Sequence, residues 1–294
     1  MFAHTCLKAV LVLNVLAAPA PMQPVLRWKL KEGDVIYHES VASTRQTMTV
    51  MGTKVDQDQE QTTVTRYTVK RKNADGGMVL EKTLVSLKGK GAVADAGLFN
   101  KIKGATFLVT LNARGEVVAL EGYKQFLAGL GADEATRSLV SMMFTEETIK
   151  QSVNEVFGCL AVKGVSVGET WRRPYLQPMG PVGDFSGEMT YRYSGKTTVG
   201  GKNLDRITFT ATMRYAPPRG PVGGGLPFRI DKADFSADEL KGTIQFDPVL
   251  GRLVESSSSG RLKGKMTINV GEQATEIEMA QTVQTKSRLL DKAP

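Results

Sequence analysis

The sequence predicts a mainly β (α+β) protein in which a curved antiparallel sheet, or half-open barrel, carries a central helical insert packed on its concave face. Three observations support this fold. Apolar and polar residues alternate along much of the chain, Gly-rich turns separate the alternating stretches, and a helical pattern interrupts them near the middle. Alternation with a period of two places one face of a strand in the core and the other in water. The 41% of hydrophobic and 23% of charged residues in these 294 residues are ordinary for a globular protein.

We expect residues 1–20 to be a secretory signal peptide. Lys8 precedes an apolar run, Ala9–Ala18, and small residues continue to Ala20, in the usual order of a basic region, an apolar region and a cleavage site. The run is too short to cross a bilayer permanently; a buried N-terminal strand or helix is the alternative. The sequence thus predicts an exported bacterial protein of the periplasm, cell envelope or extracellular space, with no transmembrane segment in the mature chain.

The mature chain, residues 21–294, is expected to form a single β-rich domain that begins with strands over residues 25–121. Residues 61–72 are rich in Thr and Val, which favour strands. Asn73–Gly77 and Asn112–Gly115 are turn sequences between neighbouring strand candidates. This first part of the chain therefore predicts an antiparallel meander.

The segment 122–160 predicts a helical insert. Thr145 is a favourable N-cap, and Glu146 and Glu147 in the first turn complement the helix dipole. The apolar residues that follow recur every three or four positions: Ile149, Val153, Val156 and Phe157. We expect this apolar face to pack on the apolar faces of the strands, because they are the only large partner available.

Strands return over residues 168–290 with clearer alternation. Ile207–Tyr215 and Met266–Val270 alternate strictly, and Gly200–Asn203 and Asp247–Gly251 are turn sequences. Each strand should therefore bury one face and expose the other.

Few residues of the mature chain are suited to nucleophilic or metal chemistry. His38 and Cys159 are its single His and single Cys. Gly164–Gly168 matches the Gly-x-Ser-x-Gly pattern, but the later His that a hydrolase triad of this type needs is missing. A structural zinc site needs about four ligands. We therefore expect no catalytic residue, metal or cofactor, a surface or edge position for His38, and a buried position for Cys159. A carboxylate-based hydrolase remains an alternative, although no pair of acids is singled out.

Basic residues gather at the end of one predicted strand and form a candidate basic patch: Arg66, Lys70, Arg71 and Lys72. With a formal net charge of +8, such a surface attracts anionic partners, and for an exported protein these are anionic envelope surfaces. Nucleic acid is not expected, because no aromatic residues are interleaved with the basic ones. A solvated face with Lys residues that protect a sheet edge is the alternative.

The helical insert and the sheet can either enclose a ligand or pack into a dry core. The candidate walls of a cavity are Met142, Met143, Ile149, Val153, Met189, Tyr191, Ile207, Phe209 and Met213. Met is an adaptable side chain that suits acyl chains of variable shape. The same residues would fill an ordinary core equally well, and the oligomeric state is left open.

Several short motifs resemble an uncharacterised family of exported bacterial proteins of unknown function. They are Leu30–Asp34, Asn112–Val117, Gly168–Trp171, Asp247–Pro248 and Gly251–Leu253. The order of elements is also similar to that of lipoprotein-carrier half-barrels, which shelter acyl chains, but no site residue is matched. The resemblance implies a curved sheet with helices on its concave face and brings no activity.

The sequence as a whole predicts a non-enzymatic exported envelope protein that acts as a binding or interaction module. The alternative is a carrier or sensor of an apolar, lipid-like ligand held between sheet and helices.

Overall fold

The computed structural model describes residues 24–91, 96–131, 134–179, 183–217, 229–270 and 273–294. The expected signal peptide lies outside these residues. The strands are β1 (Val35–Val50), β2 (Thr53–Lys72), β3 (Met78–Lys90), β4 (Thr106–Leu111), β5 (Val117–Glu121), β6 (Thr170–Pro178), β7 (Asp184–Val199), β8 (Lys202–Ala216), β9 (Arg229–Asp247), β10 (Arg252–Val270) and β11 (Gln273–Leu290). The helices are α1 (Ala96–Ile102), α2 (Tyr123–Gly129), α3 (Glu134–Met143) and α4 (Glu146–Phe157).

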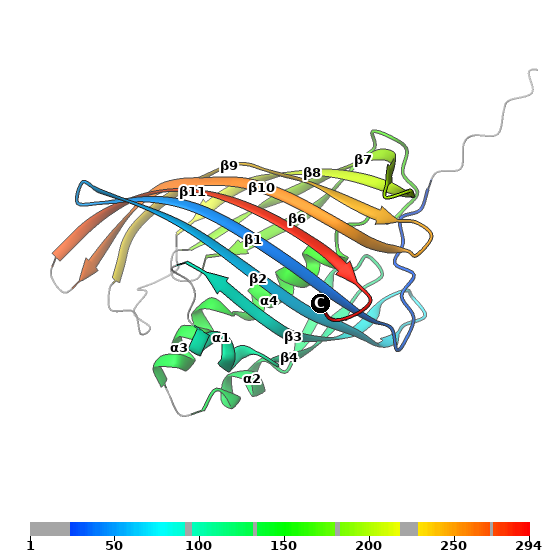
Figure 1. Ribbon diagram of the computed structural model, residues 1–294, viewed down its shortest axis with the longest axis horizontal. Helices are drawn as coiled ribbons and strands as arrows, with labels where there is room; N and C mark the ends of the chain where they lie inside the picture. Colours follow the sequence, from blue (N-terminus) through cyan, green and yellow to red (C-terminus); the bar gives the residue numbers. More distant parts are fainter. Residues whose placement is uncertain (1–23, 92–95, 132–133, 180–182, 218–228, 271–272) are drawn as a thin grey trace, which may run out of the picture.

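The strands form one antiparallel sheet in the order β5-β4-β3-β2-β1-β11-β10-β9-β8-β7-β6. The first and last strands therefore pair at its centre, with Tyr37 opposite Leu290 and Val50 opposite Ile277. The sheet does not close on itself, and its two edges, β5 and β6, flank the helical segment in the sequence. Figure 1 shows the sheet arching over the helices, which confirms the predicted curved antiparallel sheet with an insert on its concave face.

Helix α4 lies between the two edges of the sheet, in contact with both β5 and β6. It begins where the sequence predicts, because the Thr145 side chain accepts a hydrogen bond from the Thr148 backbone N–H at 3.1 Å. Its predicted apolar face is buried: Ile149, Val153, Val156 and Phe157. The helix thus fills the gap that the open sheet leaves.

One helix falls inside the segment for which the sequence predicts strands alone. Helix α1 connects β3 to β4, and its Phe99 and Ile102 form a small core cluster with Val140 of α3. A helix of 7 residues is too short for its periodicity to show in the sequence. It extends the helical layer beside α2 and α3 at one side of the molecule (Figure 1).

A row of aromatic rings crosses the concave face of β6, β7 and β8. Trp171 stacks on Tyr191 with 5.7 Å between ring centroids, and Tyr191 contacts Phe209 at 5.8 Å. The row ends over Gly242 on β9, where a Cβ atom would lie 2.3 Å from Cζ of Phe209. The missing side chain makes room for the ring.

A second row follows on the same face. Phe185 contacts Tyr215 at 5.5 Å between centroids, and Tyr215 contacts Phe235 at 5.3 Å. This row also ends over a glycine of the next strand, since a Cβ atom at Gly264 would lie 2.4 Å from Cδ1 of Phe235. On the concave face, an aromatic ring on one strand thus packs over a glycine on the next strand, in the space that a side chain would otherwise occupy.

The substitution Gly242→Ala is expected to lower the free energy of unfolding by about 1–3 kcal/mol, the usual cost of overpacking a core. The new methyl group would meet the Phe209 ring and also the Ser257 carbonyl oxygen, each at 2.3 Å. Gly129→Ala in α2 is the matched control, because no atom lies within 4 Å of its Cβ position. Urea denaturation of both variants measures the difference; equal stability of the two would contradict the packing described.

Candidate functional site

A cavity of about 450 Å³ lies between α4 and the concave face of β1 and β6 to β11. Its size falls within the range of roughly 300–1,000 Å³ found for small-molecule sites. A hollow of similar size on β9 and β10, lined by residues such as Asp231, Lys232 and Lys265, is more open to solvent. The cavity under α4 is therefore the better enclosed of these two spaces.

One wall of the cavity is apolar. Four of the nine residues predicted from the sequence line it: Met189, Tyr191, Phe209 and Met213. Phe185, Leu240 and Ile244 extend this wall along β7 and β9. Aromatic rings and flexible Met side chains are suited to an apolar ligand of irregular shape.

The other predicted cavity residues lie elsewhere. Ile149, Val153 and Ile207 belong to the main core cluster, and Ile207 and Val153 are fully buried. Met142 is partly buried on α3, and the side chain of Met143 lies outside what the structure describes. The inner face of α4 is thus divided between a dry core and the cavity.

A second wall carries hydroxyl groups on β10, β11 and β1. Ser256, Ser287 and Ser40 lie opposite one another in register across these three strands, and Ser258 lies opposite Thr285 one step further along. The Ser256 and Ser287 hydroxyls are hydrogen-bonded at 2.7 Å. The central strands thus mix small hydroxyl side chains with apolar ones (Leu253, Leu262 and Val283), whereas β6 to β8 carry mainly aromatic and Met side chains.

Helix α4 contributes one carboxylate to the cavity. The exposed surface of Glu155 faces the cavity, and Gln151 donates a hydrogen bond to its Oε1 at 3.5 Å. The surrounding protein raises the pKa of Glu155 by desolvation, and the hydrogen bond from Gln151 and the positive charge of Lys82 oppose this rise. Neither the spacing nor the composition of the chain singles out this residue.

A buried lysine lies behind this wall. Lys82 on β3 is 8% exposed, and its Nζ donates a hydrogen bond to the Ser152 hydroxyl of α4. Burial lowers the pKa of Lys82 to about 8, although the negative charge of Glu155 acts in the opposite direction. The amine thus connects the sheet to α4.

His38 also lines the cavity, so the predicted surface or edge position is wrong. Strand β1 is central, flanked by β2 and β11, and His38 lies opposite Thr65 on one side and Leu289 on the other. Desolvation and the nearby charge of Lys82 lower its pKa to about 4. The inward face of β1 is largely polar, so hydrophobic alternation gave no sign of its orientation.

The C-terminal end of α4 is held by side chains of the surrounding elements. The indole N–H of Trp28 donates to the carbonyl of Phe157 at 3.1 Å, and that of Trp171 donates to the carbonyl of Cys159 at 3.0 Å. Carbonyl groups at a helix end lack partners within the helix. Both Trp residues therefore fix the position of α4, as well as packing against the core.

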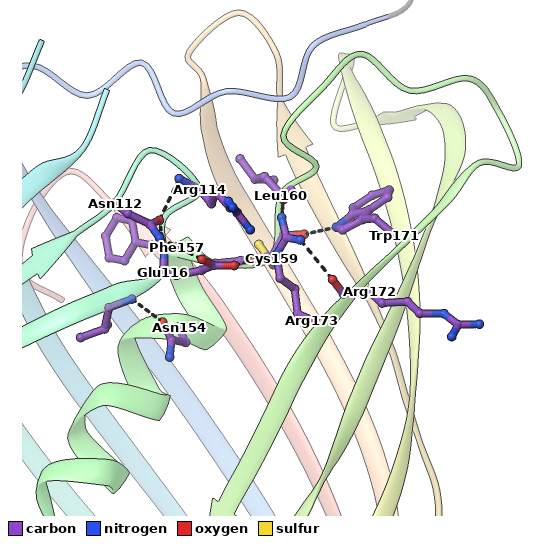
Figure 2. A network of polar contacts seen from close by, with 12 residues as sticks. Asn112, Arg114, Glu116, Asn154, Phe157, Cys159, Leu160, Trp171, Arg172 and Arg173 are labelled. Carbon is purple, nitrogen blue, oxygen red and sulfur yellow. Dashed lines mark hydrogen bonds and ion pairs between the residues drawn. The ribbon is translucent and has the colours of Figure 1, made fainter. Parts of the chain in front are cut away.

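Arg173 of β6 completes this arrangement (Figure 2). Its guanidinium donates to the carbonyls of Gly158 at 3.1 Å and Leu160 at 2.7 Å, and it forms an ion pair with Glu116 at 3.7 Å. Asn112 in turn donates to Glu116 at 2.9 Å. The side chain of Arg173 thereby joins β6, the end of α4 and the turn before β5.

Cys159 is fully buried, as the sequence predicts. Burial raises the pKa of its thiol to about 12. The thiolate is the reactive form of Cys, so this residue acts as a packing side chain.

The candidate basic residues are distributed among several partners. Arg66 and Lys70 both approach Glu81, at 3.8 and 3.7 Å, and Lys72 donates to the Leu30 carbonyl at 3.1 Å. Arg71 donates to the Asn73 side chain at 3.2 Å. These residues share one end of β2, away from the cavity lining.

Among the residues that the structure describes, no group of three or more His, Cys, Asp or Glu side chains is placed to hold a metal ion. None of the helices among these residues is both long and apolar enough to span a membrane.

Residues 39–197, more than half of the chain, match the model of a "Family of unknown function (DUF6263)". The chain therefore belongs to this family, in agreement with the resemblance to an uncharacterised family seen in the sequence. No curated protein matches the chain.

Some solved structures are weakly similar. DynF from the dynemicin biosynthesis pathway of Micromonospora chersina is 12% identical, over 94% of this chain and 91% of that chain, with a TM-score of 0.20. An outer membrane channel from Pseudomonas putida F1 is 8% identical, over 92% and 100%, with a TM-score of 0.23. A DUF1329 family protein from Desulfovibrio piger is 8% identical, over 85% and 84%, with a TM-score of 0.15. TM-scores this low carry no argument about function.

Proposed function

We propose that this member of the DUF6263 family is a non-catalytic, exported binding module that holds an apolar ligand between α4 and the sheet. The observation that carries the proposal is the cavity of about 450 Å³ with its wall of aromatic and Met side chains. Export is supported by the pattern of residues 1–20. The scarcity of His and Cys supports a binding role over catalysis.

The way α4 is held supports a space that stays open. Side chains from Trp28, Trp171 and Arg173 bind the carbonyls at its C-terminal end. Lys82 holds the Ser152 side chain further along the helix. Because both attachments fix the helix against the sheet, α4 cannot simply move inward to fill the cavity.

The basic residues of β2 support an interaction role less well. Glu81 forms ion pairs with both Arg66 and Lys70. The Nζ of Lys72 is occupied by a backbone carbonyl. An anionic surface would have to compete with these contacts, whereas a ligand in the cavity displaces only solvent.

Ligand binding is tested with the purified mature protein. Organic extraction followed by mass spectrometry identifies an endogenous apolar ligand, and titration with the uncharged fluorophore N-phenyl-1-naphthylamine tests the delipidated protein. We expect saturable binding of the fluorophore with increased fluorescence. The proposal fails if the delipidated protein does not bind the fluorophore and the native protein releases no apolar compound.

Filling the cavity is expected to weaken fluorophore binding by at least about tenfold. A side chain that occupies the space removes apolar contacts that contribute more than about 1.4 kcal/mol to the free energy of binding. Ser258→Phe and Ala237→Phe each place a ring in the space. Ser257→Phe is the matched control, because Ser257 is exposed and points away from the cavity. Thermal melts identify variants that fail to fold. Unchanged affinity in a folded Ser258→Phe or Ala237→Phe variant would contradict the site.

A further inference from the structure

A purely apolar ligand leaves the hydroxyl wall of the cavity unexplained. Among the described residues, the side-chain hydroxyls of Ser40, Thr44, Ser258 and Thr285 form no hydrogen bond within the protein, although they line the cavity. These side chains are partly exposed and line the cavity. Their hydroxyls are therefore open to hydrogen bonds with water or with a ligand there.

The charges around the cavity are of both signs. Glu155 on α4 and Arg261 on β10 line it, and Lys82 lies behind α4 with its Nζ on the Ser152 hydroxyl. An anionic ligand group would meet the carboxylate of Glu155, and a cationic one would meet Arg261. Moving an unpaired charge out of water is costly. An uncharged ligand avoids both conflicts.

From these two observations we infer that the ligand is an uncharged amphiphile, with an apolar body and hydroxyl or ester groups. The apolar body would lie against the aromatic and Met side chains of β6 to β8. The hydroxyl or ester groups would bind the Ser and Thr side chains of β10, β11 and β1, which can both donate and accept hydrogen bonds. This inference rests on the proposed binding function and specifies the chemistry of the ligand.

The test compares three competitors that share an 18-carbon acyl or alkyl chain and differ in charge. Monooleoylglycerol is uncharged, oleate is anionic and oleylamine is cationic. Each displaces N-phenyl-1-naphthylamine from the full mature protein, below the concentration at which it aggregates. We expect monooleoylglycerol to compete at least tenfold better than either charged analogue. Equal or better competition by oleate or oleylamine overturns the inference.

Removal of hydroxyl groups gives a second, independent readout. Thr285→Val keeps the shape of the side chain, and Ser258→Ala removes only the oxygen. We expect each to weaken monooleoylglycerol binding by about threefold to tenfold, the usual value of one hydrogen bond, and to weaken binding of the fluorophore less. Thr282→Val on the outer face of β11 is the control and should change neither.

The outcomes separate the two proposals. If the wild-type protein binds neither the fluorophore nor any of the three amphiphiles, the binding function itself fails. If it binds the fluorophore but Thr285→Val and Ser258→Ala leave monooleoylglycerol affinity unchanged, the function stands and the assignment of an uncharged, hydroxyl-bearing ligand is wrong.

Discussion

Arg173→Met is expected to lower the free energy of unfolding by about 3 kcal/mol, because it removes a mostly buried charge that several groups depend on. The Arg173 side chain is 13% exposed and its partner Glu116 is 30% exposed. The substitution leaves the carbonyls of Gly158 and Leu160 without their donor and removes the cation that pairs with this carboxylate. Chemical denaturation with circular dichroism measures the loss.

Arg172→Met is the matched control, because the neighbouring side chain points to the other face of β6 (Figure 2). The side chain of Arg172 is 68% exposed and forms an ion pair with Glu188 at 3.2 Å. Exposed ion pairs contribute about 0–1 kcal/mol, so this variant should stay close to the wild type. Similar losses in both variants would show that Arg173 does not fix α4.

The same substitution connects stability to binding. Helix α4 provides Glu155 and Val156 to the cavity wall, and Arg173 fixes the end of the helix only a few residues further on. If this anchor positions the wall, Arg173→Met should weaken fluorophore binding under conditions where the variant is still folded. Arg172→Met should leave that affinity unchanged.

The elements that follow local rules could be predicted from the sequence. Strands with strict alternation, such as Ile207–Tyr215, and the start of α4 at Thr145 depend on neighbouring residues alone. The placement of the helices on the concave face followed from the apolar face of α4, which needed a partner. Each of these inferences uses information contained in a short stretch of chain.

The cavity could not be predicted in the same way. Ile207 and Phe209 lie on the same face of β8, yet Ile207 is fully buried in the core while Phe209 lines the cavity. Which of them faces open space depends on how far α4 reaches, and α4 is positioned by Trp28 and Arg173 from distant parts of the chain. The pairing of Phe209 with Gly242 is likewise visible only once β8 and β9 are placed side by side.

Even less in the sequence indicated that polar residues would line the cavity. From the sequence, the strand that contains Ser40 and Thr44 is an ordinary polar strand with no predicted inward face. The reason is that apolar side chains, not hydroxyl side chains, are the usual sign of a buried position. An inward face made of hydroxyl groups reverses this rule where a cavity replaces the core. His38 belongs to that face, and its protonation offers a direct test of whether the site is enclosed.

The stability of the protein should decrease by about 2–3 kcal/mol between pH 7 and pH 4 because of His38 alone. Burial and Lys82 lower its folded-state pKa from 6.5 to about 4. Below pH 6.5 the unfolded chain takes up a proton that the folded protein resists, so stability is lost as the pH falls toward 4. One pKa unit corresponds to about 1.4 kcal/mol, and partial solvent access to the cavity reduces the total.

The variant His38→Gln isolates this contribution, since it removes the titrating group and keeps a polar side chain. The difference in unfolding free energy between wild type and variant should shrink or reverse as the pH falls from 7 to 4, while carboxylates such as Glu155 titrate in both proteins and largely cancel. An NMR titration of the imidazole should give a pKa near 4. Parallel stability curves, or an imidazole that titrates near 6.5, would mean that His38 is fully hydrated and that the cavity is open to bulk water rather than enclosed by α4.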